Sequence, residues 1–133
     1  MLLLIVLAVM GGGLVLALVA WLATRGPSEH EIFRRFDALE GFTITERHAY
    51  EGSGIAADEA RGRVAVIGKG LEKHPPVLLA AKDLVAWRYQ AKDQRFEMTV
   101  KSRRHAQPFL ILFRKRATAD EWLKIFRNIV EGR

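Results

Sequence analysis

The sequence contains no cysteine, so the side chains first considered for metal binding and nucleophilic catalysis are those of histidine and the hydroxyl residues. His30, His48, His74 and His105 are scattered, with no spacing that would place two of them on one helical face, as a metal site requires. His48 and Glu46 share one face of an expected strand, where a solvent-facing polar pair accounts for both. The sequence therefore predicts no metal ion and no other cofactor.

Nucleophilic catalysis needs a serine, threonine or lysine beside an activating base. Ser53 lies within Gly-Ser-Gly and Ser102 lies within KSRRH. Neither has the strand–turn–helix context of a nucleophile elbow. The segment IGKGLEK (67–73) lacks the glycine spacing and the Lys-Ser/Thr pair of a phosphate-binding loop. We therefore expect a protein that is not an enzyme.

Basic side chains are the remaining candidates for a functional role. All 21 basic and 15 acidic residues follow Thr24, and they give a net charge of +6. This balance favours anionic partners such as lipid head groups or an acidic protein face. No basic stripe with interleaved aromatic residues is present, so no nucleic acid is expected. The candidate contacts with an anionic partner are Arg34, Arg35, Lys101, Arg103, Arg104, Arg114, Lys115 and Arg116.

Most of these cations flank an expected hairpin around SRRHAQP (102–108). If the two strands pair, the group that begins at Lys101 and the group that begins at Arg114 lie at opposite ends and form no single patch. Two interpretations stay open for them. They are solvated strand ends that discourage edge-to-edge pairing, or they contact an anionic membrane surface.

The elements that would position these residues begin with an uncharged run. Residues 1–24 carry no charged side chain, and a helix over 2–23 would reach roughly 33 Å, enough to cross the hydrocarbon of a bilayer. A cleavable signal would have a basic start and a small residue where Trp21 stands. The sequence therefore predicts a retained transmembrane anchor over 1–25. Small residues that would let two such helices pack are Ala8, Gly12, Gly13 and Ala17.

The orientation of this anchor is predicted from the basic residues behind it. Arg25, Arg34 and Arg35 follow the span, which favours an outside amino terminus and a cytoplasmic domain at a bacterial inner membrane. Residues 26–41 are expected to be a linker and a short amphipathic helix, with Ser28 and Glu31 in a capping-box pattern. This helix lies on the membrane or packs on the domain, and the pattern does not decide between the two.

From Phe42 onward the hydrophobic period changes from 3.6 to 2, which predicts about seven short strands. A second capping box, Thr118 with Glu121, predicts a final helix. The predicted fold is α+β: a transmembrane helix, then a small antiparallel barrel or sandwich over 42–133, closed by that amphipathic helix. The apolar residues expected to close the barrel are Trp122, Ile125, Phe126 and Ile129.

The segments IAADEARGRVAVI, PVLLAAKDLVAWRYQ, FEMTV, PFLILF and ATADEWLKIFRNIV carry a resemblance. In this order of elements, the chain resembles the pleckstrin-homology-like domains of small bacterial membrane-associated proteins of unknown function. The resemblance implies a binding or scaffolding module. It does not extend to phosphoinositide recognition, because HAYEGSGIA (48–56) has no Lys or Arg where such domains cluster them.

We therefore expect a protein–protein interaction module at the inner membrane. Two alternatives are sensing of anionic lipid by the basic face and a membrane-active effector that acts through its span. The surfaces of interest are an exposed sheet edge, the loop GKGLEKHPP (68–76) and the basic turn at Arg103 and Arg104.

Overall fold

The computed structural model of the protein describes residues 28–132, which form two helices, seven strands and two short 3₁₀ turns. In chain order these are α2 (Glu29–Asp37), β1 (Glu46–Tyr50), β2 (Ser53–Asp58), η1 (Glu59–Arg61), β3 (Arg63–Ile67), β4 (Val77–Ala80), η2 (Ala81–Asp83), β5 (Leu84–Lys92), β6 (Arg95–Ser102), β7 (Phe109–Phe113) and α3 (Arg116–Glu131).

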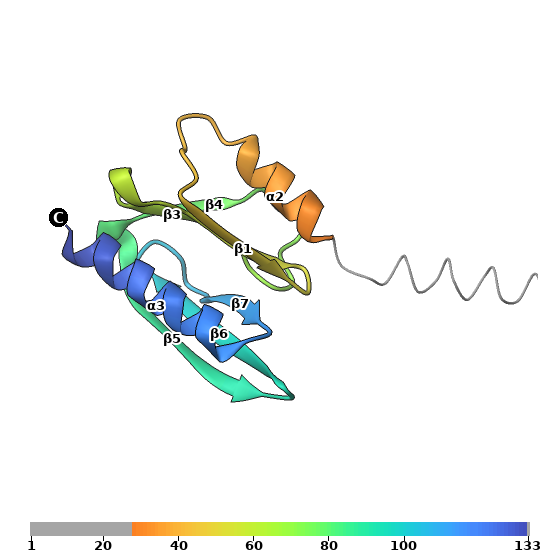
Figure 1. Ribbon diagram of the computed structural model, residues 1–133. Coiled ribbons are helices and arrows are strands. Elements are labelled where there is room, and N and C mark those ends of the chain that lie inside the picture. Colours follow the sequence, from red (N-terminus) through yellow and green to blue (C-terminus); the bar gives the residue numbers. More distant parts are fainter. Residues whose placement is uncertain (1–27, 133) are drawn as a thin grey trace, which may run out of the picture.

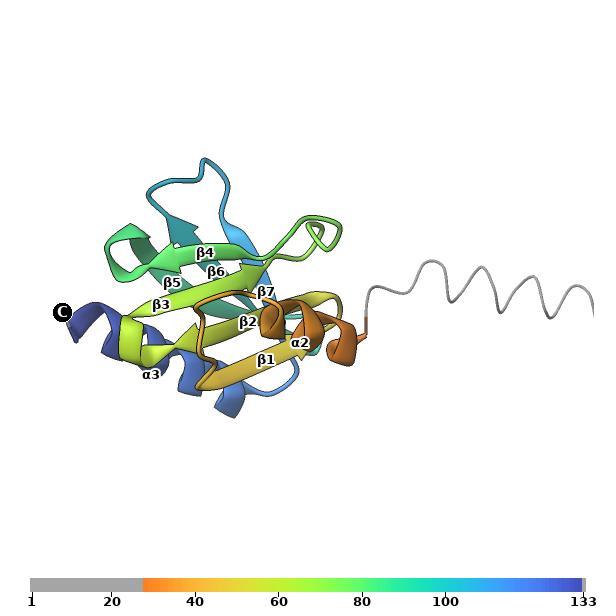
Figure 2. The same cartoon turned by 90° about the horizontal axis from the view of Figure 1, so that it is seen from above.

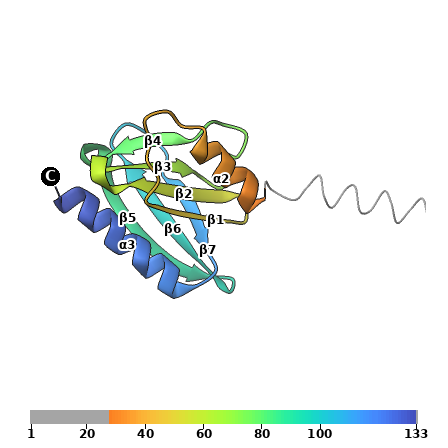
Figure 3. The same ribbon diagram turned by 45° about the horizontal axis from the view of Figure 1, so that its top comes forward.

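The strands form two antiparallel sheets (Figure 1). Sheet A has the order β1-β2-β3-β4, and sheet B has the order β5-β6-β7. The strands of sheet A lie side by side in Figure 2, and those of sheet B cross beneath them at a steep angle in Figure 3. Each strand therefore turns one face toward the other sheet, which is the burial that a period of two predicts.

The main core lies between the sheets and against α3. Ile55 of β2, Met98 of β6 and Ile111 of β7 meet there with no exposed surface. The ring centroids of Trp87 in β5 and Phe126 in α3 are 5.7 Å apart. The structure places the four predicted helix residues in this core: Trp122, Ile125, Phe126 and Ile129.

A second, smaller core lies on the opposite face of sheet A, beneath α2. Ile32 and Phe36 of α2 are fully buried against Ala56 and Ala65 of the sheet. The helix begins where the sequence predicted, because the N–H of Glu31 donates to Ser28 Oγ (3.2 Å). Of the two positions left open for this amphipathic helix, the structure shows the one packed on the domain.

The outer edge of β7 is covered by polar groups from sheet A. The N–H of Leu112 donates to Ser53 Oγ (2.8 Å), and the carbonyl of Leu112 accepts from His48 Nε2 (2.7 Å). The N–H of Lys69 donates to the carbonyl of Leu110 (2.8 Å). These bonds engage the backbone of Leu110 and Leu112 on the side of β7 that faces away from β6, and they join the two sheets at this corner.

The predicted fold class needs a correction in its first element. Within residues 28–132 no helix combines the length and the apolar character needed to cross a membrane. Helix α2 has 9 residues, roughly 14 Å at the usual rise, and α3 carries a charged face. The prediction of a single-pass membrane fold is therefore wrong for the described chain, which consists of two antiparallel sheets and two helices. The predicted anchor and its contact residues lie outside the described residues: Ala8, Gly12, Gly13 and Ala17.

Candidate functional site

The eight predicted basic contacts lie in three separate places. Arg34 and Arg35 are on α2. Residues 101–104 are at the β6–β7 turn, and residues 114–116 join β7 to α3. In the β6–β7 register Val100 pairs with Phe109 and Phe96 with Phe113, so the last two groups are at opposite ends of the hairpin. The register therefore keeps these two groups apart.

Several of these cations already have partners within the domain. Arg35 pairs with Glu31 (3.4 Å) and also donates to the carbonyl of Glu72. Arg104 pairs with the buried Asp83 (3.7 Å). The guanidinium of Arg116 lies over the ring of Phe96, 5.5 Å from its centroid. These contacts give the three cations structural roles on the surface of the domain.

A hollow of about 280 Å³ lies where β1 meets the start of α3. His48, Tyr50, Glu29, Arg114 and Lys115 line it. The His48 ring stacks on Phe113, with centroids 4.2 Å apart. Burial lowers the pKa of His48 below its ordinary value of 6.5, against the opposing effects of the Leu112 carbonyl and Glu29.

This lowered pKa predicts a pH-dependent stability. The unfolded chain takes up a proton on His48 at a higher pH than the folded chain does. The stabilisation is therefore present above about pH 6.5 and is lost as the pH falls below it, by at most about 1.4 kcal/mol per pH unit. We expect the free energy of unfolding, measured in urea at pH 7.5 and 5.5, to fall more for the natural chain than for His48→Gln. Equal falls would contradict the assignment to His48.

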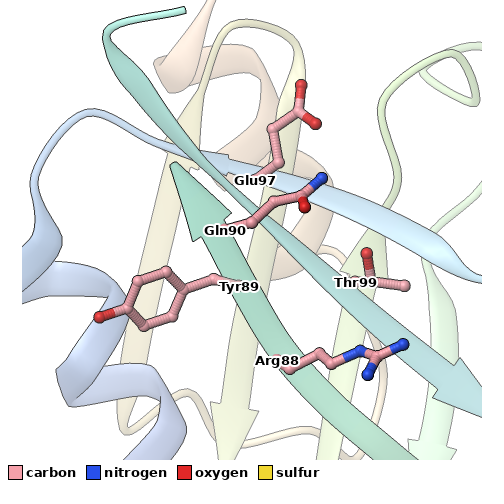
Figure 4. A pocket seen from close by; sticks show the side chains of 5 residues that line it. All are labelled: Arg88, Tyr89, Gln90, Glu97 and Thr99. Carbon is pink, nitrogen blue, oxygen red and sulfur yellow. The ribbon is translucent and has the colours of Figure 1, made fainter. Parts of the chain in front are cut away.

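A larger hollow of about 420 Å³ lies on the outer face of sheet B (Figure 4). Its floor is formed by two cross-strand pairs, Arg88 with Thr99 and Gln90 with Glu97. Figure 4 shows Tyr89 directed toward α3, where its hydroxyl donates to Asp120. Arg88 and Gln90 are exposed, as on a solvated sheet face, whereas Glu97 is buried and pairs with Arg95 (3.4 Å).

Apolar exposure gathers on a different part of the molecule. Within residues 28–132, the large apolar side chains that are more than a third exposed are Leu71 (39%), Leu78 (38%) and Val85 (54%). All three belong to the continuous segment 71–85, which runs from the β3–β4 loop through β4 and η2 to the start of β5. We refer to β4 with its flanking loop and turn, residues 68–85, as the β4 surface.

The β4 surface is bordered by a largely apolar groove of about 350 Å³. Ala38 and Leu39, which follow α2, form one wall, and Pro75 and Pro76 of the loop form the other. The side chain of Leu78, two residues after Pro76, lies on the same side of sheet A as α2, because its cross-strand partner Ala65 belongs to the core beneath α2. The cationic side chains at the rim of the groove are Arg35 and Lys73, and His74 lies beside them.

The basic β6–β7 turn lies at the other end of β4. The N–H of Arg103 donates to the carbonyl of Asp83 in η2 (2.7 Å), and Asp83 also pairs with Arg104. The structure thus brings together the three surfaces named from the sequence: a sheet edge, the 68–76 loop and the turn at Arg103 and Arg104. The contribution of α2 was missed, because the sequence left its packing open.

Between Ser28 and Gly132, no three His, Asp or Glu side chains lie close enough to hold a metal ion. No family model, curated protein or solved structure matches the chain. The function is therefore inferred from the geometry of the β4 surface itself.

Proposed function

We propose that the described domain is a protein-interaction module and that the β4 surface is its binding site. The observation that carries this proposal is a set of exposed apolar side chains on one segment of the chain beside an apolar groove. Leu71, Leu78 and Val85 lie within 15 residues, 71–85, and no other large apolar side chain of residues 28–132 is as exposed. Exposed apolar side chains bordered by an apolar groove favour a surface that a partner covers.

The groove beside β4 supports the same proposal. Its lining of alanine, leucine and proline suits an apolar side chain from a partner, and its cationic rim suits polar or acidic neighbours of that side chain. The sequence resemblance to pleckstrin-homology-like domains also favours a binding or scaffolding role. The separation of the cations into three places disfavours the alternative of one basic lipid-sensing face.

Site-specific photo-crosslinking in cells tests this proposal. A photoreactive residue at position 78 should capture a partner, and the same residue at Gln90, exposed on the outer face of sheet B, should not. The captured protein is then purified and its affinity for the full chain is measured. We expect Leu78→Asp to weaken the affinity at least tenfold, and Gln90→Asp to leave it unchanged. Equal capture at both positions, or equal affinities for both variants, would overturn the assignment of the site.

A further inference from the structure

The backbone of β4 is open on one side, and its hydrogen bonds show which groups are free. In an antiparallel strand, successive residues direct their N–H and C=O groups to alternate sides. The N–H of Ala81 donates to the carbonyl of Gly62, beside β3 (3.0 Å), whereas the N–H of Ala80 donates to Asp83 Oδ2 (3.2 Å). Residues 79 and 81 therefore face β3, and residues 78 and 80 face away from it.

Leu78 presents both of its backbone groups at this edge. Sheet A ends at β4, and within residues 28–132 no other group donates to or accepts from the backbone of Leu78. The neighbouring positions offer fewer donors. Asp83 occupies the N–H of Ala80, and Pro76, directly before the strand, has none. A neighbouring strand could therefore pair with the backbone N–H and C=O of Leu78 at this edge. The partly exposed side chain of Leu78 lies beside these two groups.

Positive charge lies at both ends of β4. Lys73 precedes the strand, and Lys82, Arg103 and Arg104 lie at its end. Among the described residues no ion pair engages Lys73, Lys82 or Arg103. The two acids nearby are already committed, since Glu72 pairs with Lys69 and Asp83 is buried beside Arg104. An acidic segment is therefore the electrostatic complement of this edge.

The same charges argue against a second copy of this chain as the occupant. Antiparallel pairing of two β4 edges would bring the Lys73 end of one copy against the Lys82 and Arg103 end of the other. Like charges placed opposite each other oppose such pairing. A partner with acidic residues on both sides of an apolar residue meets no such repulsion.

We propose that the β4 surface binds an extended acidic segment of a partner protein by adding it to sheet A as a fifth strand beside β4. This inference rests on the proposed function. The backbone of Leu78 exchanges two hydrogen bonds with the segment, and an apolar residue of the segment packs on the Leu78 side chain. Its acidic residues lie near Lys73 at one end and near Lys82 and Arg103 at the other.

A display library of random 12-residue peptides, selected on the full 133-residue chain, tests the predicted partner chemistry. We expect enriched peptides to share an apolar residue flanked by Asp or Glu. Affinities of the synthetic peptides should fall as salt concentration rises. They should also fall at least fivefold in Lys82→Glu/Arg103→Glu. The matched control is Arg88→Glu/Lys124→Glu, which reverses two exposed cations on sheet B and α3 and should bind as the natural chain does.

The variant Leu78→Pro tests strand addition itself. Proline removes the N–H that faces the open edge, while the ladder to β3 uses the neighbouring residues. We expect the affinity for the selected peptides to fall at least tenfold, with an unchanged circular dichroism spectrum as the check on folding. Leu78→Ala, which keeps the N–H and removes the apolar side chain, separates the two contributions.

The outcomes distinguish the two proposals. If a folded Leu78→Pro weakens binding no more than Leu78→Ala does, the β4 surface is a binding site but strand addition is wrong. If Leu78→Pro does not fold, amide hydrogen exchange of the natural chain decides instead: the Leu78 amide must become protected when peptide binds, and an unprotected amide overturns strand addition. Enriched peptides without acidic residues overturn the predicted partner chemistry. If no peptide binds and position 78 captures no partner, both proposals fail.

Discussion

Replacing Asp58 with alanine is expected to lower the free energy of unfolding by about 3 kcal/mol, because this carboxylate is a buried charge with several partners. Asp58 has no exposed surface, and its Oδ2 lies 3.3 Å from Arg63 Nη2 and 3.7 Å from Arg61 Nη1. The same oxygen accepts the N–H of Thr43 (3.1 Å). It therefore joins the end of β2, the start of β3 and the chain that leads into β1.

The expected loss is at the lower end of the range for a broken buried pair, because Arg63 keeps some contact with water. Urea denaturation of the full chain measures it. Glu46→Ala is the matched control, since Glu46 is an exposed acid on the same sheet with no ion pair among the described residues, and its effect should stay within about 0.5 kcal/mol. Losses of similar size in the two variants would show that Asp58 does not stabilise the junction of β2, β3 and the chain that leads into β1.

Local patterns in the sequence predicted most of the strands. The alternation of Phe96, Met98 and Val100 with polar residues in RFEMTVKS predicts a strand over 95–102, and β6 has these bounds. The apolar run in PFLILFRKR predicts a strand over 108–116, but β7 ends at Phe113 because the chain turns there into α3. Strand ends depend on which neighbouring strand is present to pair, and the sequence pattern does not contain that information.

The start of the last helix shows how a short motif can mislead. Thr118 and Glu121 fit a capping box, yet the helix begins at Arg116, and the N–H of Ala119 already donates to the carbonyl of Lys115 (3.3 Å). The N-cap Lys115 makes no side-chain capping bond. The apolar stripe was unaffected by this shift, because Trp122 and Phe126 keep their spacing wherever the first turn begins.

The candidate site was only partly predictable. The loop at 68–76 and the basic turn at Arg103 and Arg104 were named from composition. That they lie at the two ends of one strand follows from the order of strands in sheet A and from the bond between Arg103 and Asp83. The exposure of Leu78 could not be read from PVLLA, where Leu78 and Leu79 are equally apolar. The pairing of β4 with β3 shows that Leu79 faces the core between the sheets, whereas Leu78 lies on the α2 side of sheet A.

Gly54→Ala is expected to lower the free energy of unfolding by about 1–3 kcal/mol, because α2 packs directly on the backbone of β2 at this glycine. A Cβ added at Gly54 would lie 2.5 Å from Ile32 Cγ2 and 3.2 Å from Phe36 Cε2. Both side chains are fully buried beneath α2, so the helix must shift to make room. Urea denaturation measures the loss. Gly68→Ala, whose added Cβ would meet its neighbours at 3.4 Å or more, is the matched control and should cost less.

A double-mutant cycle identifies the contact responsible. Ile32→Leu removes the β-branched methyl group that the new Cβ would meet, so the double variant Gly54→Ala/Ile32→Leu should recover part of the loss, with a coupling energy of about 1 kcal/mol. The same variants also test whether the position of α2 affects binding at the β4 surface. Because Ala38 and Leu39 follow α2 and form one wall of the groove, a displaced α2 should weaken binding at the β4 surface, and Ile32→Leu should restore it. Strictly additive free energies would show that α2 does not rest on Gly54, and unchanged binding would show that the groove wall does not move with α2.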